Sequence, residues 1–172
     1  VTVLSSRHEK NLPLQEMVDG IRIVRAPVLM KISKGTVMPT FGVLAAQLIA
    51  DHDIVHIHLP QFDSAIIAGL AKIRKKPVVI TYHCDLIMPP GAIPWLANQT
   101  VLVMNRFAAH LANIIVTYTQ DYADHSEFLH AYRKKLKIVS PPVDLPAVSQ
   151  KEIIDYKHRT NPNEKRPVIG MA

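Results

Sequence analysis

Asp53–Pro60 (DIVHIHLP) is a run of apolar, mostly β-branched residues that ends in polar groups, and Pro77–Asp85 (PVVITYHCD) has the same design. A segment of helical character separates them. Such runs are typical of buried parallel strands, whose carboxyl ends meet at one edge of an α/β sheet and carry ligand-binding groups there. The two stretches predict a parallel α/β sheet whose edge presents histidine and aspartate side chains.

The composition is that of an ordinary globular protein. Of the 172 residues, 48% are hydrophobic and 20% charged, and this length is enough for one domain with a substantial core. No apolar run is long enough to cross a bilayer. The single cysteine, Cys84, excludes an internal disulfide and favours a cytoplasmic location. The net charge of +6 favours anionic partners, but no aromatic residues interleave with the basic runs, so we expect no nucleic-acid partner.

Segments with the character of strands and helices alternate from residue 53 onward, which predicts parallel pairing with right-handed crossovers. The expected strands are residues 53–58, 77–83, 113–118 and 136–139. The expected helices are residues 40–50, 64–76, 95–111, 120–131 and an exposed helix at 151–158. Upstream we expect strands at 1–5 and 21–25, an irregular polar segment at 7–19 and a loop at 27–39.

The helices carry local predictions of their own. Asp63 or Ser64 is expected to cap the second helix, and Thr119 the fourth, by accepting a free N–H of the first turn. The apolar face of the second helix is expected to consist of Ile66, Ile67, Leu70 and Ile73. On the third helix, the residues expected in the core rather than on a binding surface are Trp95, Met104 and Phe107.

The candidate site residues lie at the strand ends. His56 and His58 share one face, because residues two apart on a strand point the same way. That spacing suits a metal, but no nearby Cys or Glu completes a ligand set, so we expect no metal. His83 ends its strand two residues before Asp85, where an imidazole can contact a sugar hydroxyl or a phosphate oxygen, or be bonded to loop backbone. There is no Gly-rich phosphate loop and no Gly-x-Ser-x-Gly elbow.

Four motifs, in this order, resemble the amino-terminal half of a retaining glycosyltransferase of family 4. They are DIVHIHLP (53–60), VITYHCD (79–85), IVTYTQDY (115–122) and IVSPPVD (138–144). The resemblance implies one half of a GT-B fold, in which two Rossmann-like domains face each other across a cleft, truncated here at both ends. It implies an acceptor domain without its first strand at residues 1–148, a connecting helix and linker at 149–166, and the first strand of a missing nucleotide-sugar domain at 167–172.

The same resemblance implies a reaction: transfer of a hexose from a nucleotide sugar to a lipid or saccharide acceptor, with retention of configuration and without a cofactor or metal. His83 would be the catalytic histidine that contacts the reacting sugar. The acceptor side would be formed by Asp85, His58, Asp63 and Tyr82. Without the second domain the chain is expected to be inactive. The missing first strand would lie between the strands at 1–5 and 53–58, so a rearranged sheet or another chain is expected to fill its place.

Two other functions stay open at this point. One is a sugar-nucleotide epimerase, which shares the GT-B architecture. The other is a non-catalytic α/β module that binds an anionic glycan or lipid headgroup, which the basic runs allow. Independently, the segment Met30–Phe41 mixes apolar residues with Lys31 and Lys34, which suggests peripheral contact with the inner face of a membrane.

Overall fold

The computed structural model describes residues 1–32, 35–87, 89–142 and 147–160. It divides into two compact units, Val1–Ser140 and Pro141–Ala172. In the second unit the described secondary structure is α6 (Gln150–Thr160), and all its residues are exposed. The expected exposed helix is therefore confirmed. The linker expected up to residue 166 falls, beyond α6, outside the described residues, as does the strand expected at 167–172.

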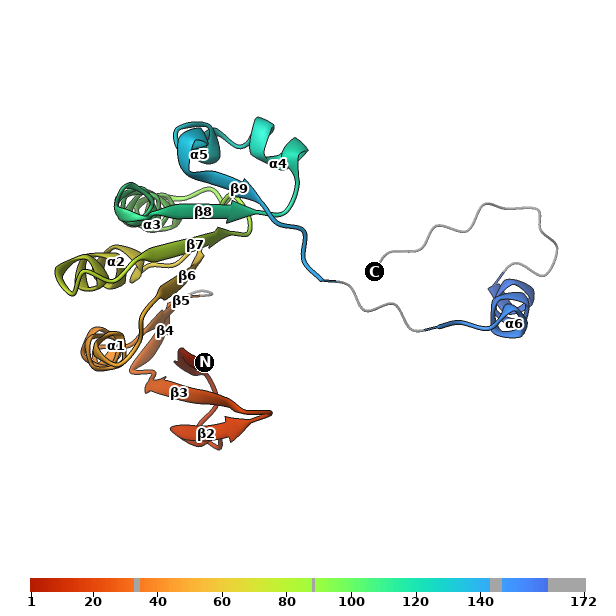
Figure 1. The fold of residues 1–172 in the computed structure, drawn as a ribbon, viewed down its shortest axis with the longest axis horizontal. Helices are drawn as coiled ribbons and strands as arrows, with labels where there is room; N and C mark the ends of the chain where they lie inside the picture. The colour runs from red at the N-terminus through yellow and green to blue at the C-terminus, as the bar shows by residue number, and fades with distance from the viewer. Residues whose placement is uncertain (33–34, 88, 143–146, 161–172) are drawn as a thin grey trace. The chain divides into compact units, whose positions relative to one another are not determined.

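A four-stranded parallel sheet organises the first unit (Figure 1). Its order is β6 (Val55–Leu59), β7 (Val78–Tyr82), β8 (Ile114–Thr117) and β9 (Leu136–Ile138), each strand pairing in parallel with the next. The predicted alternation, and the α/β fold with a Rossmann-like parallel sheet flanked by helices, are thus confirmed. Along β6, alternate residues are buried (Val55, Ile57, Leu59), which leaves the two histidines on the other face.

The crossover helices show which faces are buried. The helices are α1 (Phe41–Ala50), α2 (Ser64–Ile73) and α3 (Ala92–Leu111). On α2 the buried residues are Ser64, Ile67, Ala68 and Ala71, one stripe at helical spacing. Ile66 and Ile73 lie outside this stripe and are exposed, so their predicted place on the apolar face was wrong.

The buried stripe of α3 runs through Asn105, Ala108 and Ala109, and small residues there let α3 pack closely on α2. Trp95 (61% exposed) and Phe107 (53% exposed) point away from it, which corrects their predicted core position; Met104 is half-buried.

The predicted cap of α2 was also wrong. Asp63 occupies the N-cap position, but its backbone (φ −81°, ψ 4°) is not extended, and its side chain makes no capping bond. A capping side chain reaches the free N–H groups from an extended backbone, which explains the difference. The Ser64 hydroxyl instead donates to Oδ1 of Asn105 at 3.0 Å.

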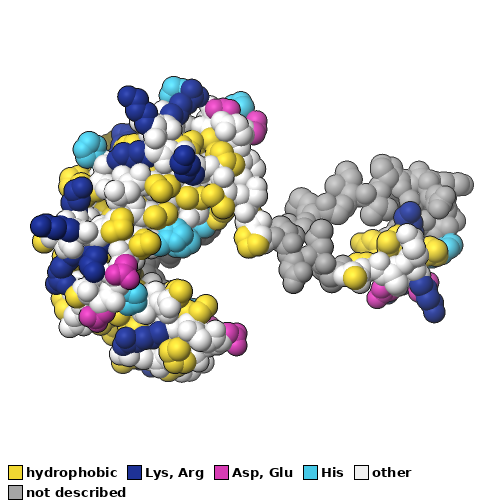
Figure 2. Space-filling model, viewed as in Figure 1, with side chains coloured by type: hydrophobic (Ala, Val, Ile, Leu, Met, Phe, Trp, Pro, Cys, Tyr) yellow, Lys and Arg dark blue, Asp and Glu magenta, His cyan; other side chains and the backbone are white. Residues whose placement is uncertain are grey.

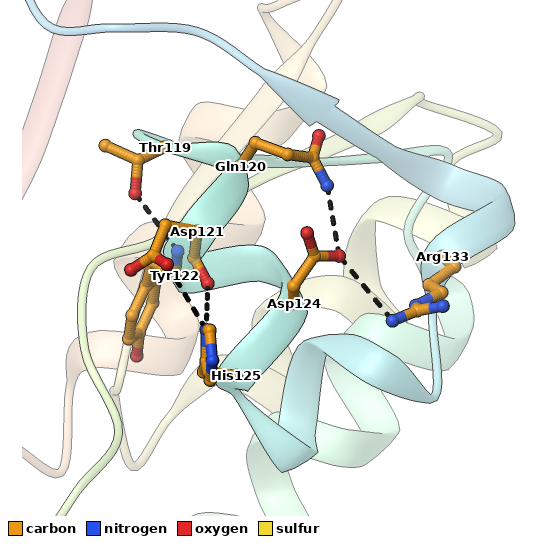
Figure 3. Close-up of polar contacts among 7 residues, drawn as sticks. All are labelled: Thr119, Gln120, Asp121, Tyr122, Asp124, His125 and Arg133. Atoms are coloured by element: carbon orange, nitrogen blue, oxygen red, sulfur yellow. Dashed lines mark hydrogen bonds and ion pairs between the residues drawn. The ribbon is translucent and has the colours of Figure 1, made fainter.

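The segment expected as one helix at 120–131 is two helices, α4 (Gln120–His125) and α5 (Glu127–His130). Thr119 caps α4 as predicted, accepting from the backbone N–H of Tyr122 at 3.2 Å (Figure 3). Ser126 has an extended backbone (ψ 118°) and caps α5, which breaks the helix. The carboxylate of Asp124 accepts a hydrogen bond from the side chain of Gln120 and forms an ion pair with Arg133, which follows α5 (Figure 3). These contacts connect α4 to the segment after α5. A 3-10 turn, η1 (Arg133–Lys135), leads into β9.

The amino-terminal part contains more strands than predicted. β1 (Thr2–Arg7) pairs in parallel with β3 (Ile21–Pro27), and β2 (Gln15–Val18) pairs antiparallel with β3. The turn between β2 and β3 is Asp19-Gly20, both with positive φ (49° and 78°), which suits a two-residue hairpin. β4 (Met30–Ile32) and β5 (Gly35–Val37) form a second hairpin where a loop was expected.

The two larger sheets are separate. Within the described residues no strand pairs with both β1 and β6, so the β1–β3–β2 sheet and the β6–β9 sheet are not joined by hydrogen bonds. Helix α1 packs on β1 and β3, and its Phe41, Ala45 and Ile49 belong to the same core cluster as β6 and β7. Nδ1 of His52, after α1, donates to the carbonyl of Leu48 at 2.7 Å, while Nε2 contacts the Thr2 hydroxyl at 3.0 Å.

Candidate functional site

The carboxyl edge of the parallel sheet carries His83. β7 ends at Tyr82, and the backbone N–H of His83 donates to the carbonyl of Leu59 at 3.0 Å. This bond extends the β6–β7 ladder by one residue, and it holds the start of the following loop beside the end of β6. The His83 side chain is exposed at this edge, as its place at the end of a β-branched run predicted.

Both ring nitrogens of His83 have side-chain partners. Nε2 lies 2.8 Å from Nδ1 of His58, and Nδ1 is bonded to the hydroxyl of Tyr118, at the end of β8. The rings of His58 and His83 stack with centroids 5.1 Å apart, and His56 stacks on His58 at 4.6 Å. His56 Nε2 contacts the Thr81 hydroxyl at 2.8 Å. Three adjacent strands therefore supply one exposed row of aromatic hydrogen-bonding groups, which we call the histidine row (His56, His58, His83 and Tyr118).

The electrostatics around His56 and His58 favour neutral rings for these two histidines. Burial lowers the pKa of His56, and the nearby His83 lowers it further. Burial also lowers the pKa of His58, with added repulsion from His56 and His83. Placing imidazoles this close makes it costly to charge them together. Neutral imidazoles offer one donor and one acceptor each, which suits hydroxyl recognition better than anion binding.

Asp85 is the hub of a second cluster beside the histidine row. Its Oδ1 accepts from the hydroxyls of Tyr82 at 2.9 Å and Ser126 at 3.1 Å, and its Oδ2 accepts from the hydroxyl of Tyr122 at 2.8 Å. Burial and the bond to Asp85 raise the pKa of both tyrosines well above the usual range, so both stay protonated donors. The carboxylate thus fixes the loop after β7 to the α4–α5 junction.

Asp63 and Tyr82 occupy different positions from the exposed histidines. Asp63 precedes α2, and burial raises the pKa of its carboxyl. Tyr82 is buried (1% exposed), and its ring stacks on Phe128 at 4.3 Å, so only its hydroxyl, bonded to Asp85, meets the site. Of the residues expected at the site, the structure brings His58 and His83 together and Tyr82 and Asp85 together. Asp63 has no contact with either group in the described hydrogen bonds.

Three residues of the site were missed: Tyr118, Tyr122 and Ser126. Tyr118 could have been found, because it directly follows a strand of the same sheet, and strand ends gather at one edge. Tyr122 and Ser126 come from α4 and the break before α5, which the helical pattern did not reveal. Within the described part of the chain no cluster of three or more His, Cys, Asp or Glu side chains is arranged to hold a metal.

A sequence model of glycosyltransferase family 4 matches residues 1–146. The chain belongs to this family. The match covers most of the sequence, including the histidine row and the Asp85 cluster, so both lie within a glycosyltransferase domain. No curated protein matches the chain. Among its described helices, none combines the length and the apolar character that a membrane crossing needs.

Proposed function

We propose that this glycosyltransferase domain forms the acceptor side of an enzyme that transfers a hexose from a nucleotide sugar to a lipid or saccharide acceptor with retained configuration. The observation that carries the proposal is His83: an exposed imidazole at the carboxyl edge of the sheet, held at both nitrogens by His58 and Tyr118. In a parallel α/β sheet this edge is where ligands bind. Family membership over residues 1–146 supports the reaction class.

The roles follow from the contacts. A hydroxyl of the reacting sugar replaces His58 or Tyr118 as the partner of one His83 nitrogen, and the remaining contact holds the plane of the ring. Tyr82 and Asp85 stiffen the adjoining loop, whereas Asp63 flanks the mouth of the site. The pKa values of His56 and His58 are lowered, which keeps these two rings uncharged at neutral pH. The reaction uses no cofactor or metal besides the donor, and a second, nucleotide-sugar-binding domain completes it, so the chain alone does not turn over.

The test combines binding and turnover on the 172-residue chain. Titration with methyl α-glucoside or methyl α-mannoside should shift the imidazole NMR signals of His83 and His58, and His83→Asn should weaken this binding at least tenfold. His110→Asn, on an exposed part of α3, is the matched control and should bind like the parent. Unperturbed signals at high saccharide concentration would contradict the sugar site. Turnover of labelled nucleotide sugars by the chain alone would contradict its inactivity.

Peripheral membrane contact is a second candidate role, favoured by the β4–β5 hairpin. Leu29 (71% exposed), Met30 (53%) and Val37 (36%) present apolar surface there, next to Lys31. Lys34, expected to contribute, lies outside the described residues. On the face drawn in Figure 2 the basic side chains are spread over the first unit rather than gathered in one patch. We place the domain in the cytoplasm, at the inner membrane face.

Charge-reversal variants distinguish docking through the β4–β5 hairpin from a general attraction caused by the net charge. Lys31→Glu should reduce binding to vesicles with 30% phosphatidylserine several-fold, since each basic residue near an anionic surface contributes about 1 kcal/mol. Lys76→Glu, after α2, changes the net charge equally and serves as the control. Equal losses in both variants would indicate attraction by overall charge, without docking through the hairpin.

A further inference from the structure

Both ring nitrogens of His83 are used by contacts within the protein. Nε2 lies 2.8 Å from Nδ1 of His58, and Nδ1 is bonded to the hydroxyl of Tyr118. A neutral imidazole has one donor and one acceptor, so these two contacts use its whole capacity. A ligand can bind the ring only in exchange for one of them. Which contact is exchanged decides whether His83 donates to the ligand or accepts from it.

The direction of the two hydrogen bonds follows from the chemistry of the groups. A phenol O–H is a stronger donor than the N–H of a neutral imidazole, so Tyr118 donates to Nδ1 of His83. The proton of the His83 ring then lies on Nε2, which donates to Nδ1 of His58. His58 in turn carries its proton on Nε2, where water can accept it, because this side chain is exposed. Bonds that follow one another in a single direction polarise and strengthen each other.

The imidazole of His58 is held firmly. His58 lies inside β6, and its ring stands between the rings of His56, with centroids 4.6 Å apart, and His83, with centroids 5.1 Å apart. His56 is itself bonded to the hydroxyl of Thr81 at 2.8 Å. A ligand that displaced His58 would therefore disturb the contacts of two other side chains.

The side chain of Tyr118 is held less firmly. Tyr118 comes directly after β8, which ends at Thr117, and its ring meets that of His83 at an edge, with the ring planes 60° apart. The side chain is half-buried, so water can become the partner of its hydroxyl if His83 is released. Exchanging a hydrogen bond within the protein for one to water costs little. Of the two partners of His83, Tyr118 is the one that a ligand displaces at lower cost.

We propose that Tyr118 takes the place of the substrate on His83: its hydroxyl donates to the nitrogen that accepts a hydroxyl of the reacting sugar, and the tyrosine moves away when the sugar binds. The inference rests on the proposed function. Because one O–H donor replaces another, the proton on the His83 ring stays on Nε2, and His58 continues to hold the plane of the ring. Tyr118 is thus a positioning residue that keeps His83 in the accepting tautomer and competes with the sugar.

The exchange sets a requirement for the ligand. Only a free hydroxyl can donate to Nδ1 of His83, so an ether oxygen at the same position cannot replace Tyr118. A site that hydrogen-bonds a substrate hydroxyl rejects analogues that lack it. Methyl tetra-O-methyl-α-glucoside, in which every ring hydroxyl is an ether, should therefore bind at least tenfold more weakly than methyl α-glucoside.

The tautomers provide the first test. Long-range proton–nitrogen correlation NMR of the 172-residue chain at pH 7.5 should show His83 with its proton on Nε2 and an unprotonated Nδ1, and the same tautomer for His58. Tyr118→Phe should leave both tautomers as they are, because His58 still accepts from His83. A His83 ring with its proton on Nδ1 in the parent would overturn the proposal, since Tyr118 would then be an acceptor.

The sign of an affinity change provides the second test. Tyr118→Phe keeps the aromatic ring but removes the competing hydroxyl, so methyl α-glucoside or methyl α-mannoside should bind about two- to tenfold more tightly than to the parent. A tyrosine that only supported His83 would give the opposite result, weaker binding. Tyr156→Phe, on the exposed helix α6, removes a phenol hydroxyl elsewhere and should bind like the parent. His58→Leu removes the acceptor that fixes the tautomer and should bind at least threefold more weakly.

The outcomes separate this inference from the proposed function. Saccharide binding that is unchanged or weaker in Tyr118→Phe would overturn the exchange alone and leave the sugar site in place. Equal binding of the O-methylated glucoside would also overturn it. Absence of saccharide binding in both the parent and Tyr118→Phe would overturn the proposed function, and the exchange with it.

Discussion

Asp85 is the residue on which the geometry of the site depends most. Its carboxylate accepts three hydroxyl groups, from Tyr82, Tyr122 and Ser126, which belong to β7, α4 and the α4–α5 junction. Because the hydrogen bonds of this carboxylate are made within the protein, we expect Asp85 to order the loop around the site rather than to bind ligand. Hydrogen bonds to a charged acceptor contribute more to stability than neutral ones.

Replacing Asp85 by alanine should destabilise the chain by about 2–4 kcal/mol, because three hydroxyl donors lose a charged acceptor. The hydroxyl of Tyr82 is largely shielded from water, so water cannot easily replace the lost carboxylate there. Urea unfolding followed by circular dichroism measures this loss. Asp121→Ala removes an exposed carboxylate of α4 and should change the free energy of unfolding by less than about 0.5 kcal/mol. Similar losses in the two variants would show that the Asp85 cluster contributes no special stability.

The lowered pKa values of His56 and His58 predict a pH dependence. The unfolded chain, with ordinary histidine pKa values near 6.5, binds protons more readily than the folded one. The free energy of unfolding should therefore fall as the pH drops below about 6.5, and level off below the folded pKa values. His56→Gln combined with His58→Gln should flatten this decrease between pH 7.5 and 5.

A histidine with the opposite shift provides the control for this pH dependence. Asp121 raises the pKa of His125, so that histidine favours the folded state at low pH. His125→Gln should leave the decrease as steep as before or steeper. If the double variant kept the full decrease, other groups would be responsible. The urea midpoint at each pH is the quantity compared.

Some contacts of the site could be predicted from the order of the strands alone, and others could not. His58 and His83 end adjacent strands, so their meeting follows from a parallel sheet. The bond between His83 and Tyr118 needs the register as well: Thr81 lies opposite Val116, which sets Tyr118 level with His83. Nothing in the local sequence fixes that register, because it results from packing of the whole sheet.

Among the secondary-structure elements, α3 is joined to the sheet edge by one buried amide. Asn105 is 1% exposed, and its Oδ1 accepts from the backbone N–H of Gln61 at 3.2 Å and from the hydroxyl of Ser64 at 3.0 Å. The amide thereby holds the start of α2 and the turn after β6. It was invisible in the sequence, because a polar residue in a helix is more often exposed than buried.

Asn105→Leu should cost about 2–3 kcal/mol, since it fills the same space but leaves two donors without an acceptor. Gln99→Leu makes a similar change of an amide to leucine on the exposed side of α3 and should stay within about 0.5 kcal/mol. Thermal unfolding of both variants at one pH provides the measurement. A tolerated Asn105→Leu would mean that water reaches Gln61 and Ser64.

The sequence predicted the strands of the parallel sheet well and those of the two hairpins poorly. The strands β7 (VVITY) and β8 (IIVT) are nearly continuous apolar runs, and runs of this kind are distinctive. The strands β2, β4 and β5 have three or four residues each, mix polar and apolar types, and form only because a neighbouring strand supplies their hydrogen bonds. The Asp19-Gly20 pair was the available signal for the β2–β3 hairpin.

For the whole first unit, the sequence predicted the parallel sheet, but not that β1 and β6 belong to separate sheets. In the structure the β1–β3–β2 sheet and the β6–β9 sheet are separate, with a pocket lined by residues 1–4 and 54–58 between them. A rearranged pairing of β1 with β6 does not form among the described residues, because α1 packs on β1 and β3 and also belongs to the core around β6, which holds the two edges apart.

This separation predicts that the two sheets differ in stability. The β6–β9 sheet contains the most buried strand, β7, whereas the β1–β3–β2 sheet is partly exposed along β1 and is joined to the rest through α1 and the His52–Thr2 contact. Native-state hydrogen exchange should therefore show amides of β3 opening at least tenfold more readily than those of β7, a difference of about 1.4 kcal/mol or more. Equal opening free energies would mean that the sheets unfold as one unit.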